Sequence, residues 1–223
     1  MKKIQMVDLK SQYDKIKDVV NTSIQEVLDT NTYINGPQVH QFQKNLEEYL
    51  DVKHVIPCAN GTDALQVAMM GLDLKPGDEV ITADFTFAAT VEVIALLQLT
   101  PVLVDVDLHN MNISIEGIKK AITPKTKAIV VVHYAGIACD MDKIMSIAEA
   151  NNLFVIEDAA QAVDSFYKGR PLGSIGHLSA FSFHETKNIS CGEGGALIVN
   201  KKEWIEPAEI IWEKGTNRAA FKR

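Results

Sequence analysis

The sequence has 223 residues, a net charge of −7, 47% hydrophobic residues and 23% charged residues, a balance typical of one globular domain or two small ones. The negative charge and the lack of a basic stripe argue against nucleic acid and anionic membranes as main partners. The first residues, M-K-K-I-Q-M-V-D-L-K, lead into no apolar segment, so no secretory signal is expected. No apolar run reaches the length of about 18 residues that a transmembrane helix needs.

The three cysteines, Cys58, Cys139 and Cys191, are widely spaced and form no C-x-x-C motif. This usage fits reduced thiols in a cytoplasmic protein, and we expect all three to be small core residues.

Apolar residues at helical spacing predict an amphipathic helix over residues 12–30 and a second helix that ends at Leu50, after the break at Asn35-Gly36-Pro37. From residue 54 onward, strands and helices alternate. The expected strands cover residues 54–60, 80–83, 101–106, 128–133, 154–156, 179–183 and 196–199, and the expected helices cover residues 64–72, 86–99, 115–122 and 140–150.

Most of these strands are continuous apolar runs rather than alternating ones, which is typical of a sheet covered on both faces. The alternation of strand and helix favours an α/β fold with a mainly parallel sheet. The sequence therefore predicts a mainly parallel seven-stranded sheet with helices on both faces.

An acid and a lysine follow two of the expected strands. The strand Phe154 to Ile156 ends in Glu157 and Asp158, and the strand that begins at Ser179 ends shortly before Lys187. Ligands of open α/β sheets bind at the carboxyl ends of the strands. A lysine beside an acid at this edge indicates Schiff-base chemistry with a carbonyl cofactor. The alternatives without a catalytic role are a solvated loop lysine for Lys187 and an acid that caps the following turn for Asp158.

A second candidate site is the turn Asn60-Gly61-Thr62-Asp63, which joins a strand to a helix. Glycine permits close approach, and free N–H groups at a helix N-terminus favour an anion. The alternative is an ordinary N-cap formed by Thr62 or Asp63. The run G-E-G-G-A at 192–196 lacks dinucleotide-binding spacing, and the sequence has neither H-E-x-x-H nor a cysteine–histidine cluster, so no metal site is expected.

Three motifs in this order, V-I-E-D-A-A-Q at 155–161, S-F-H-E-T-K-N at 182–188 and G-E-G-G-A, resemble the DegT/DnrJ/EryC1/StrS family of sugar aminotransferases, which use pyridoxal 5′-phosphate (PLP). The resemblance covers almost the whole chain. It implies the large domain of a fold type I aminotransferase, with the strand at 196–199 antiparallel. It also implies that residues 1–223 comprise an N-terminal segment and this PLP-binding domain, without the small C-terminal domain of the family.

The resemblance implies a role for each matching residue. Lys187 would bind the cofactor as a Schiff base, and Asp158 would pair with the protonated pyridine nitrogen. The remaining cofactor contacts would be Gln161 near the phenolic oxygen, Phe87 stacked on the ring, and Gly61, Thr62 and Ser182 on the phosphate. For Phe87 and Ser182 the alternatives are simple packing and an ordinary strand serine.

Three further residues near strand ends receive no catalytic role. Strand alternation predicts that Glu157 points away from Asp158, so we expect it to be structural. His133 and His184 are likewise expected to be structural or supporting residues.

The implied activity is transfer of the amino group of L-glutamate to a nucleotide-linked keto-deoxysugar for cell-surface polysaccharide or related amino-sugar biosynthesis, in a homodimer. H-Y-A-G-I-A-C-D-M-D at 133–142 and the lysine motif most resemble the branch that makes 4-amino-4,6-dideoxyhexoses, such as dTDP-4-amino-4,6-dideoxygalactose, from dTDP-4-keto-6-deoxyglucose. The first hundred or so residues resemble the broader family, which includes enzymes for UDP-3-keto sugars.

Two other readings stay open. One is a PLP-fold fragment or regulatory domain that binds without turnover. The other is a sugar 3-dehydratase, which has histidine at the lysine position and is disfavoured by Lys187.

Overall fold

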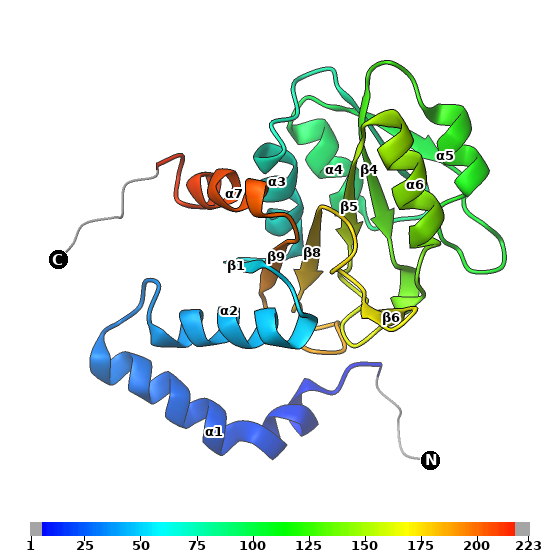
Figure 1. The fold of residues 1–223 in the computed structure, drawn as a ribbon. Helices are drawn as coiled ribbons and strands as arrows, with labels where there is room; N and C mark the ends of the chain where they lie inside the picture. The colour runs from blue at the N-terminus through cyan, green and yellow to red at the C-terminus, as the bar shows by residue number, and fades with distance from the viewer. Residues whose placement is uncertain (1–5, 217–223) are drawn as a thin grey trace, which may run out of the picture.

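A seven-stranded sheet forms the centre of the computed structural model, which describes residues 6–216 (Figure 1). Its strands are β1 His54–Cys58, β2 Glu79–Ala83, β3 Thr100–Val104, β4 Thr126–Val132, β5 Phe154–Asp158, β8 Leu178–Ser182 and β9 Gly195–Val199. They lie in the order β1-β9-β8-β5-β4-β2-β3. β9 runs antiparallel to both of its neighbours, whereas the other pairs are parallel. The predicted sheet and its single antiparallel strand are confirmed.

Within residues 6–216 the α-helices are α1 Leu9–Thr30, α2 Pro37–Leu50, α3 Gly61–Gly71, α4 Ala88–Leu96, α5 Ile115–Ala121, α6 Met141–Asn151 and α7 Ile205–Trp212, with short 3₁₀ turns at Tyr134–Gly136 and Lys202–Trp204. The helices expected from the sequence are all present. The helix α7 and the two-stranded hairpin of β6 Phe166–Tyr167 and β7 Arg170–Pro171 were not predicted. The hairpin strands have two residues each, and α7 is short and contains Pro207 in its first turn, so neither produces a clear apolar period.

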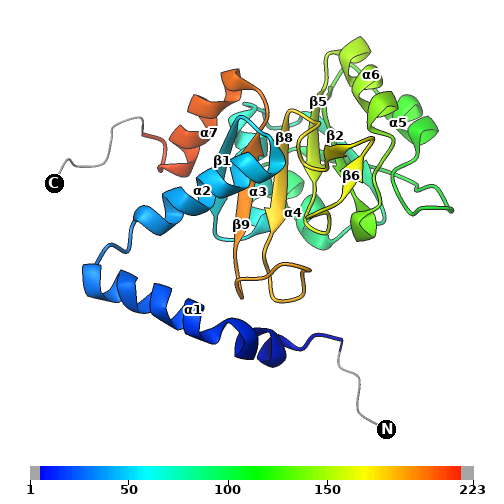
Figure 2. The same ribbon diagram turned by 60° about the horizontal axis from the view of Figure 1, so that its bottom comes forward.

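The sheet separates two hydrophobic cores. One core contains residues of α2, α5 and α6, and the other contains residues of α3, α4 and α7. Adjacent strand residues point into different cores, as Val155 and Ile156 do in β5. Because both faces are covered (Figures 1 and 2), most strand positions in the centre of the sheet are apolar, and the alternation of an exposed sheet is absent. Buried polar residues such as Glu157 and Ser179 are exceptions.

The first helix, α1, is the exception to this packing. It has the predicted amphipathic pattern, yet none of its residues is buried. Ile16 and Ile24 are each 54% exposed, and Val19 is 72% exposed. Figures 1 and 2 show α1 beside α2 and away from the sheet. Most of its apolar stripe therefore stays exposed in the described part of the chain, with Val20 and Val27 half-buried.

The three cysteines are free thiols. Cys139 is buried and Cys58 is half-buried, but Cys191 is exposed. The prediction of a core position is wrong for Cys191, because it lies in the loop between β8 and β9 rather than in a helix or strand.

Among residues 6–216, no helix has both the length and the apolarity required to cross a membrane. The expectations for the first five and last seven residues fall outside the described range.

Candidate active site

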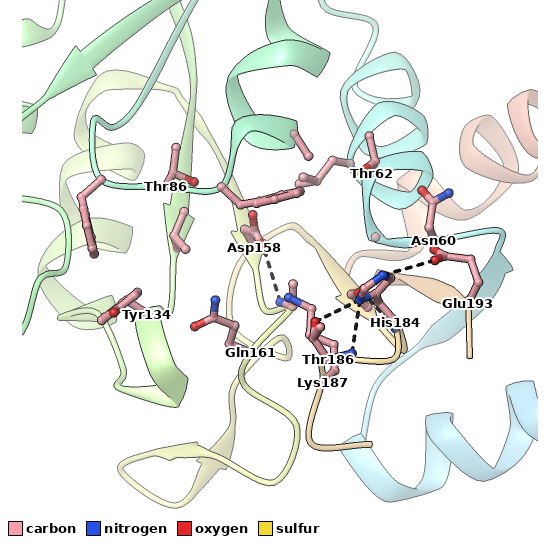
Figure 3. A pocket seen from close by; sticks show the side chains of 18 residues that line it. Asn60, Thr62, Thr86, Tyr134, Asp158, Gln161, His184, Thr186, Lys187 and Glu193 are labelled. Carbon is pink, nitrogen blue, oxygen red and sulfur yellow. Dashed lines mark hydrogen bonds and ion pairs between the residues drawn. The ribbon is translucent and has the colours of Figure 1, made fainter. Parts of the chain in front are cut away.

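A cavity of about 630 Å³ opens at the carboxyl edge of the sheet (Figure 3). Its wall is formed by the start of α3, the segment between β2 and α4, the ends of β4, β5 and β8, and the loop that follows β8. The site residues expected from the sequence all line this one cavity: Gly61, Thr62, Phe87, Asp158, Gln161, Ser182 and Lys187. The structure thus brings together residues that lie more than a hundred positions apart, while their individual roles stay predictions.

Asp158 ends β5 and lies at the base of the cavity, only 6% exposed. Its Oδ2 accepts a hydrogen bond of 2.8 Å from the Thr90 hydroxyl, and its Oδ1 accepts one of 3.2 Å from the Ala160 amide. Burial raises the pKa of Asp158, while the Thr90 and Ala160 hydrogen bonds and the charge of Lys187 oppose that rise. The turn-capping alternative is therefore real, but it occupies only one oxygen. A cation in the cavity would favour the ionised carboxylate further.

Lys187 is half-buried in the cavity wall, in a loop held by local hydrogen bonds. The Lys187 amide donates to the His184 carbonyl at 2.9 Å. The Thr186 amide donates to His184 Nδ1 at 3.2 Å, and the Thr186 hydroxyl lies 2.9 Å from the same nitrogen. Its other ring nitrogen lies 3.9 Å from the Glu193 carboxylate. These contacts fix the turn between β8 and the lysine, and they keep Lys187 close enough to Asp158 to influence its pKa.

The turn before α3 is built to leave backbone donors free. Asn60 is the N-cap of α3, because its side chain accepts the Asp63 amide at 2.8 Å. The expected alternative of a cap by Thr62 or Asp63 is wrong. Within the described chain, the amides of Gly61 and Thr62 have no acceptor, and both residues line the cavity. The first turn of a helix with unpaired N–H groups attracts an anion.

Two glycines keep this turn close to the sheet. A Cβ atom on Gly61 would lie 3.0 Å from Ser182 Cβ, and one on Gly195 would lie 2.3 Å from the Asn60 carbonyl group. The close packing brings Ser182 against the first residue of α3, and both residues line the cavity. Two amides and at least one hydroxyl form a donor set suited to a phosphate group.

Phe87 and Gln161 complete the set of expected residues. Phe87 precedes α4 and is 74% exposed, so simple packing does not account for it. Gln161 accepts a hydrogen bond of 2.7 Å from the Ala135 amide at its Oε1. Its Nε2 group is then the part left to donate to a ligand.

Several residues of the cavity wall received no functional role from the sequence. Tyr134 follows β4 and packs edge-on against Phe85, with ring centroids 5.0 Å apart. Both rings line the cavity, as do His184 and Glu193. Only their position in the sequence could have indicated them, because each of these residues follows a strand end or flanks a predicted site residue. His184 was expected to be a structural or supporting residue, and it lines the cavity wall.

Glu157 and His133 lie outside the cavity. Both side chains are fully buried and hydrogen bonded to each other at 2.8 Å. Strand alternation correctly predicts that Glu157 points away from Asp158.

Comparison with known proteins now decides the family. The DegT/DnrJ/EryC1/StrS aminotransferase family matches residues 14–223. The chain belongs to this family. A relative from Pseudomonas aeruginosa, UDP-2-acetamido-2-deoxy-3-oxo-D-glucuronate aminotransferase, is 42% identical over 216 residues, which are 96% of this chain and 60% of the relative. A second, UDP-N-acetyl-3-dehydro-alpha-D-glucosamine 3-aminotransferase from Acidithiobacillus ferrooxidans, is 41% identical and is matched over 91% of this chain and 55% of the relative.

The fold is also that of the family. The crystal structure of a DegT DnrJ EryC1 StrS aminotransferase from Brucella abortus superposes with a TM-score of 0.91 at 39% identity, covering 99% of this chain and 61% of that protein. This agreement confirms the fold type I assignment. The chain spans less than two thirds of the length of the relatives it matches.

PLP is the cofactor in this family, and homologous structures contain it or its amino form. The residues of this chain fit the group. Free amides and a hydroxyl suit the phosphate, an exposed aromatic side chain suits a planar ring, and a buried carboxylate with one hydrogen-bonded hydroxyl suits a cationic ring nitrogen. A lysine in the same cavity suits the aldehyde.

Proposed function

We propose that this chain is the cofactor-binding part of a PLP-dependent aminotransferase that moves the amino group of L-glutamate to a nucleotide-linked keto sugar. The observation that carries the proposal is the single cavity shared by Lys187, Asp158 and the free amides of Gly61 and Thr62. The family membership gives the reaction class. The arrangement gives each residue a physical task.

The amides of Gly61 and Thr62 and the hydroxyl of Ser182 bind the cofactor phosphate and fix its position. Asp158 would hold a proton on the pyridine nitrogen, helped by the Thr90 hydroxyl, whose hydrogen bond opposes the rise that burial causes in the pKa of Asp158. When bound, PLP accepts electron density from the amino-acid α-carbon through its protonated ring. Lys187 would hold the cofactor through its aldehyde, and its Nζ, once free, would take the α-carbon proton of the amino donor.

The sugar we propose is a UDP-linked 3-keto sugar. The sequence motifs favoured dTDP-4-keto-6-deoxyglucose and kept the UDP-3-keto sugar as an alternative. Two relatives at 42% and 41% identity carry names for UDP-linked 3-oxo or 3-dehydro sugars, and they support the alternative. The amino-sugar product would serve polysaccharide biosynthesis.

The substrate contacts are proposed to be shared. Because the matched relatives are much longer than this chain, residues of the longer protein and of a second subunit in a homodimer would complete the sugar-binding surface. Residues 1–223 would then correspond to the N-terminal segment and cofactor-binding domain.

The test has a chemical and a kinetic arm. Borohydride reduction in the presence of PLP should label the peptide that contains Lys187, and the label should vanish in Lys187→Ala. In a full-length enzyme, Asp158→Asn should keep some cofactor but reduce the transamination rate by about 10²-fold or more, as loss of a preorganised charge often does. Labelling of another lysine would refute the role of Lys187, and an unchanged rate would leave Asp158 with turn capping alone.

The same assay separates the substrates and the main rival. A UDP-3-keto sugar should turn over faster than dTDP-4-keto-6-deoxyglucose with L-glutamate as donor. The reverse order would restore the first expectation. PLP binding without turnover of either sugar in the full-length protein would favour the regulatory or non-catalytic reading.

A further inference from the structure

A buried, hydrogen-bonded carboxylate–histidine pair lies behind the cavity. Glu157 directly precedes Asp158 in β5 but faces the opposite side of the sheet. Its Oε2 lies 2.8 Å from His133 Nε2, and neither side chain is exposed. A charged carboxylate at such a site is stable only if its oxygens are well hydrogen bonded.

Glu157 meets that condition with four donors. Besides His133, the amide of Gly173 donates to Oε2 at 2.9 Å, and the amides of Ile175 and Gly176 donate to Oε1 at 2.7 and 2.6 Å. Burial alone would raise the pKa of Glu157, but the bonds from His133 and the backbone amides lower it below its usual value. The side chain is therefore an ionised acceptor with both oxygens occupied.

The His133 ring has a defined tautomer. The Cys139 amide donates to Nδ1 at 3.2 Å, so Nδ1 carries no proton and Nε2 donates its proton to Glu157. The backbone amide of His133 also donates to the Asp158 carbonyl at 3.2 Å. These bonds hold the segment after β4 against the end of β5.

This segment in turn orients a cavity residue. Ala135 adopts a left-handed conformation with φ of 52°, and its amide donates to Gln161 Oε1 at 2.7 Å. The side chain of Tyr134 lines the cavity from the same turn. A displacement of the His133 segment would therefore move Tyr134 and release the Gln161 amide.

Three elements with cavity residues thus meet at one carboxylate. β5 carries Asp158, the segment after β4 carries Tyr134 and holds Gln161, and the turn 173–176 leads into β8, which carries Ser182. We propose that Glu157 is a positioning residue, which acts through His133 and the 173–176 turn to fix these three elements relative to one another and so to align the ring-binding side chains. The identity of the ligand in this proposal rests on the proposed function. The role of Glu157 in fixing the three elements does not depend on it.

Glu157→Gln tests the proposal with little change in shape. The glutamine amide has one acceptor oxygen, and whichever way it is turned, its NH₂ group faces two N–H donors. We expect faster hydrogen exchange at the amides of Ala135, Gly173 and Ile175 in the cofactor-free chain, with unchanged exchange in α3. The PLP dissociation constant should rise about tenfold, the effect of weakening about one hydrogen bond between the misaligned side chains and the ligand, while that of inorganic phosphate stays within about twofold.

The exposed Glu149 on α6 offers a matched control, because Glu149→Gln makes the same chemical change away from the cage of four donors around Glu157, which are His133 and the amides of residues 173, 175 and 176. Unchanged exchange at Ala135 and Gly173 in a folded Glu157→Gln protein would overturn the proposal. Parallel losses of PLP and phosphate binding would also overturn it, since they would indicate general destabilisation. If the unaltered chain binds no PLP, the proposed function fails, and the exchange measurement still decides the positioning role.

A second pair of variants covers the case in which Glu157→Gln does not fold. At position 133, glutamine can place an N–H donor near the Nε2 position, whereas asparagine can supply only the acceptor near Nδ1. His133→Asn should therefore reproduce the exchange pattern expected for Glu157→Gln, and His133→Gln should stay closer to the unaltered chain. The opposite order would show that the bond to Glu157 is not what fixes the segment.

Discussion

The hydroxyl of Thr90 donates a 2.8 Å hydrogen bond to Oδ2 of Asp158, at a point where both side chains are buried. Thr90 lies in the first turn of α4, and its hydroxyl also accepts one from Thr86 at 2.9 Å. The α4 helix therefore supplies a donor that favours the charged form of an acid whose pKa is raised by burial.

Replacement of Thr90 by valine should make Asp158 harder to ionise. The hydrogen bond lowers the pKa of Asp158, so its loss raises the pKa further, and the acidic limb of PLP binding should move to higher pH. The measurement is the PLP dissociation constant as a function of pH. Thr90→Ser keeps the hydroxyl and should leave the limb in place. An identical limb in the valine variant would mean that the bond has no bearing on ionisation.

The phosphate-binding role of α3 and β8 can be separated from general affinity. Thr62→Ala combined with Ser182→Ala removes the side-chain hydroxyls but keeps the backbone amides. Binding of PLP should weaken by about 1–3 kcal/mol, the range for lost hydrogen bonds to a charged group, whereas binding of pyridoxal without its phosphate should hardly change. Equal losses for both ligands, measured by titration calorimetry, would argue against a phosphate contact.

Gly195 should tolerate no side chain. A Cβ atom there would lie 2.3 Å from the carbonyl carbon and oxygen of Asn60, which are backbone atoms at the cap of α3. Gly195→Ala is expected to lower the free energy of unfolding by about 1–3 kcal/mol through overpacking, and to weaken phosphate binding because the cap must shift. Gly71→Ala is the control, since its added Cβ would lie at an ordinary 3.6 Å from Ala208. Denaturant titration measures the free energy of unfolding of both variants. Equal stability of Gly195→Ala and Gly71→Ala would contradict the argument.

The buried carboxylate of Glu157 predicts an acid-sensitive contribution to stability. Its pKa is lowered in the folded protein. The stabilisation is therefore fully present above the pKa of unfolded glutamate, about 4.3, and is lost as the pH falls through the lower folded value. Urea unfolding at a series of pH values should show a steep acidic loss that is smaller in Glu157→Gln. The same steepness in that variant would place the acid sensitivity elsewhere.

The sequence predicted the sheet because its central strands lie between two helical layers and are therefore mostly apolar. Val155 and Ile156 show the reason, since neighbouring residues enter different cores. The helix α7 was not predicted because it is short and contains Pro207 in its first turn. The cavity residues could be named because the family motifs place them at strand ends, where a parallel sheet gathers them.

Two features of the site could not be read from the sequence. Thr90 and Asp158 are 68 positions apart, and nothing in a threonine inside a helix indicates a distant carboxylate partner. The cage around Glu157 depends on the backbone amides of Gly173, Ile175 and Gly176, and backbone donors have no side-chain signature. Both features exist only after the chain has folded.

The position of β9 has a consequence for how the protein is made. β1 lies at the edge of the sheet, and its one neighbouring strand in the described structure is β9, with His54 opposite Val199 and Cys58 opposite Gly195. During synthesis, β1 leaves the ribosome early but can pair only after β9 has emerged. Such long-range pairing closes late and slowly. The α3 turn that follows β1, with its free amides, is therefore expected to reach its final place only at the end of folding, so cofactor capture would follow the completion of the sheet.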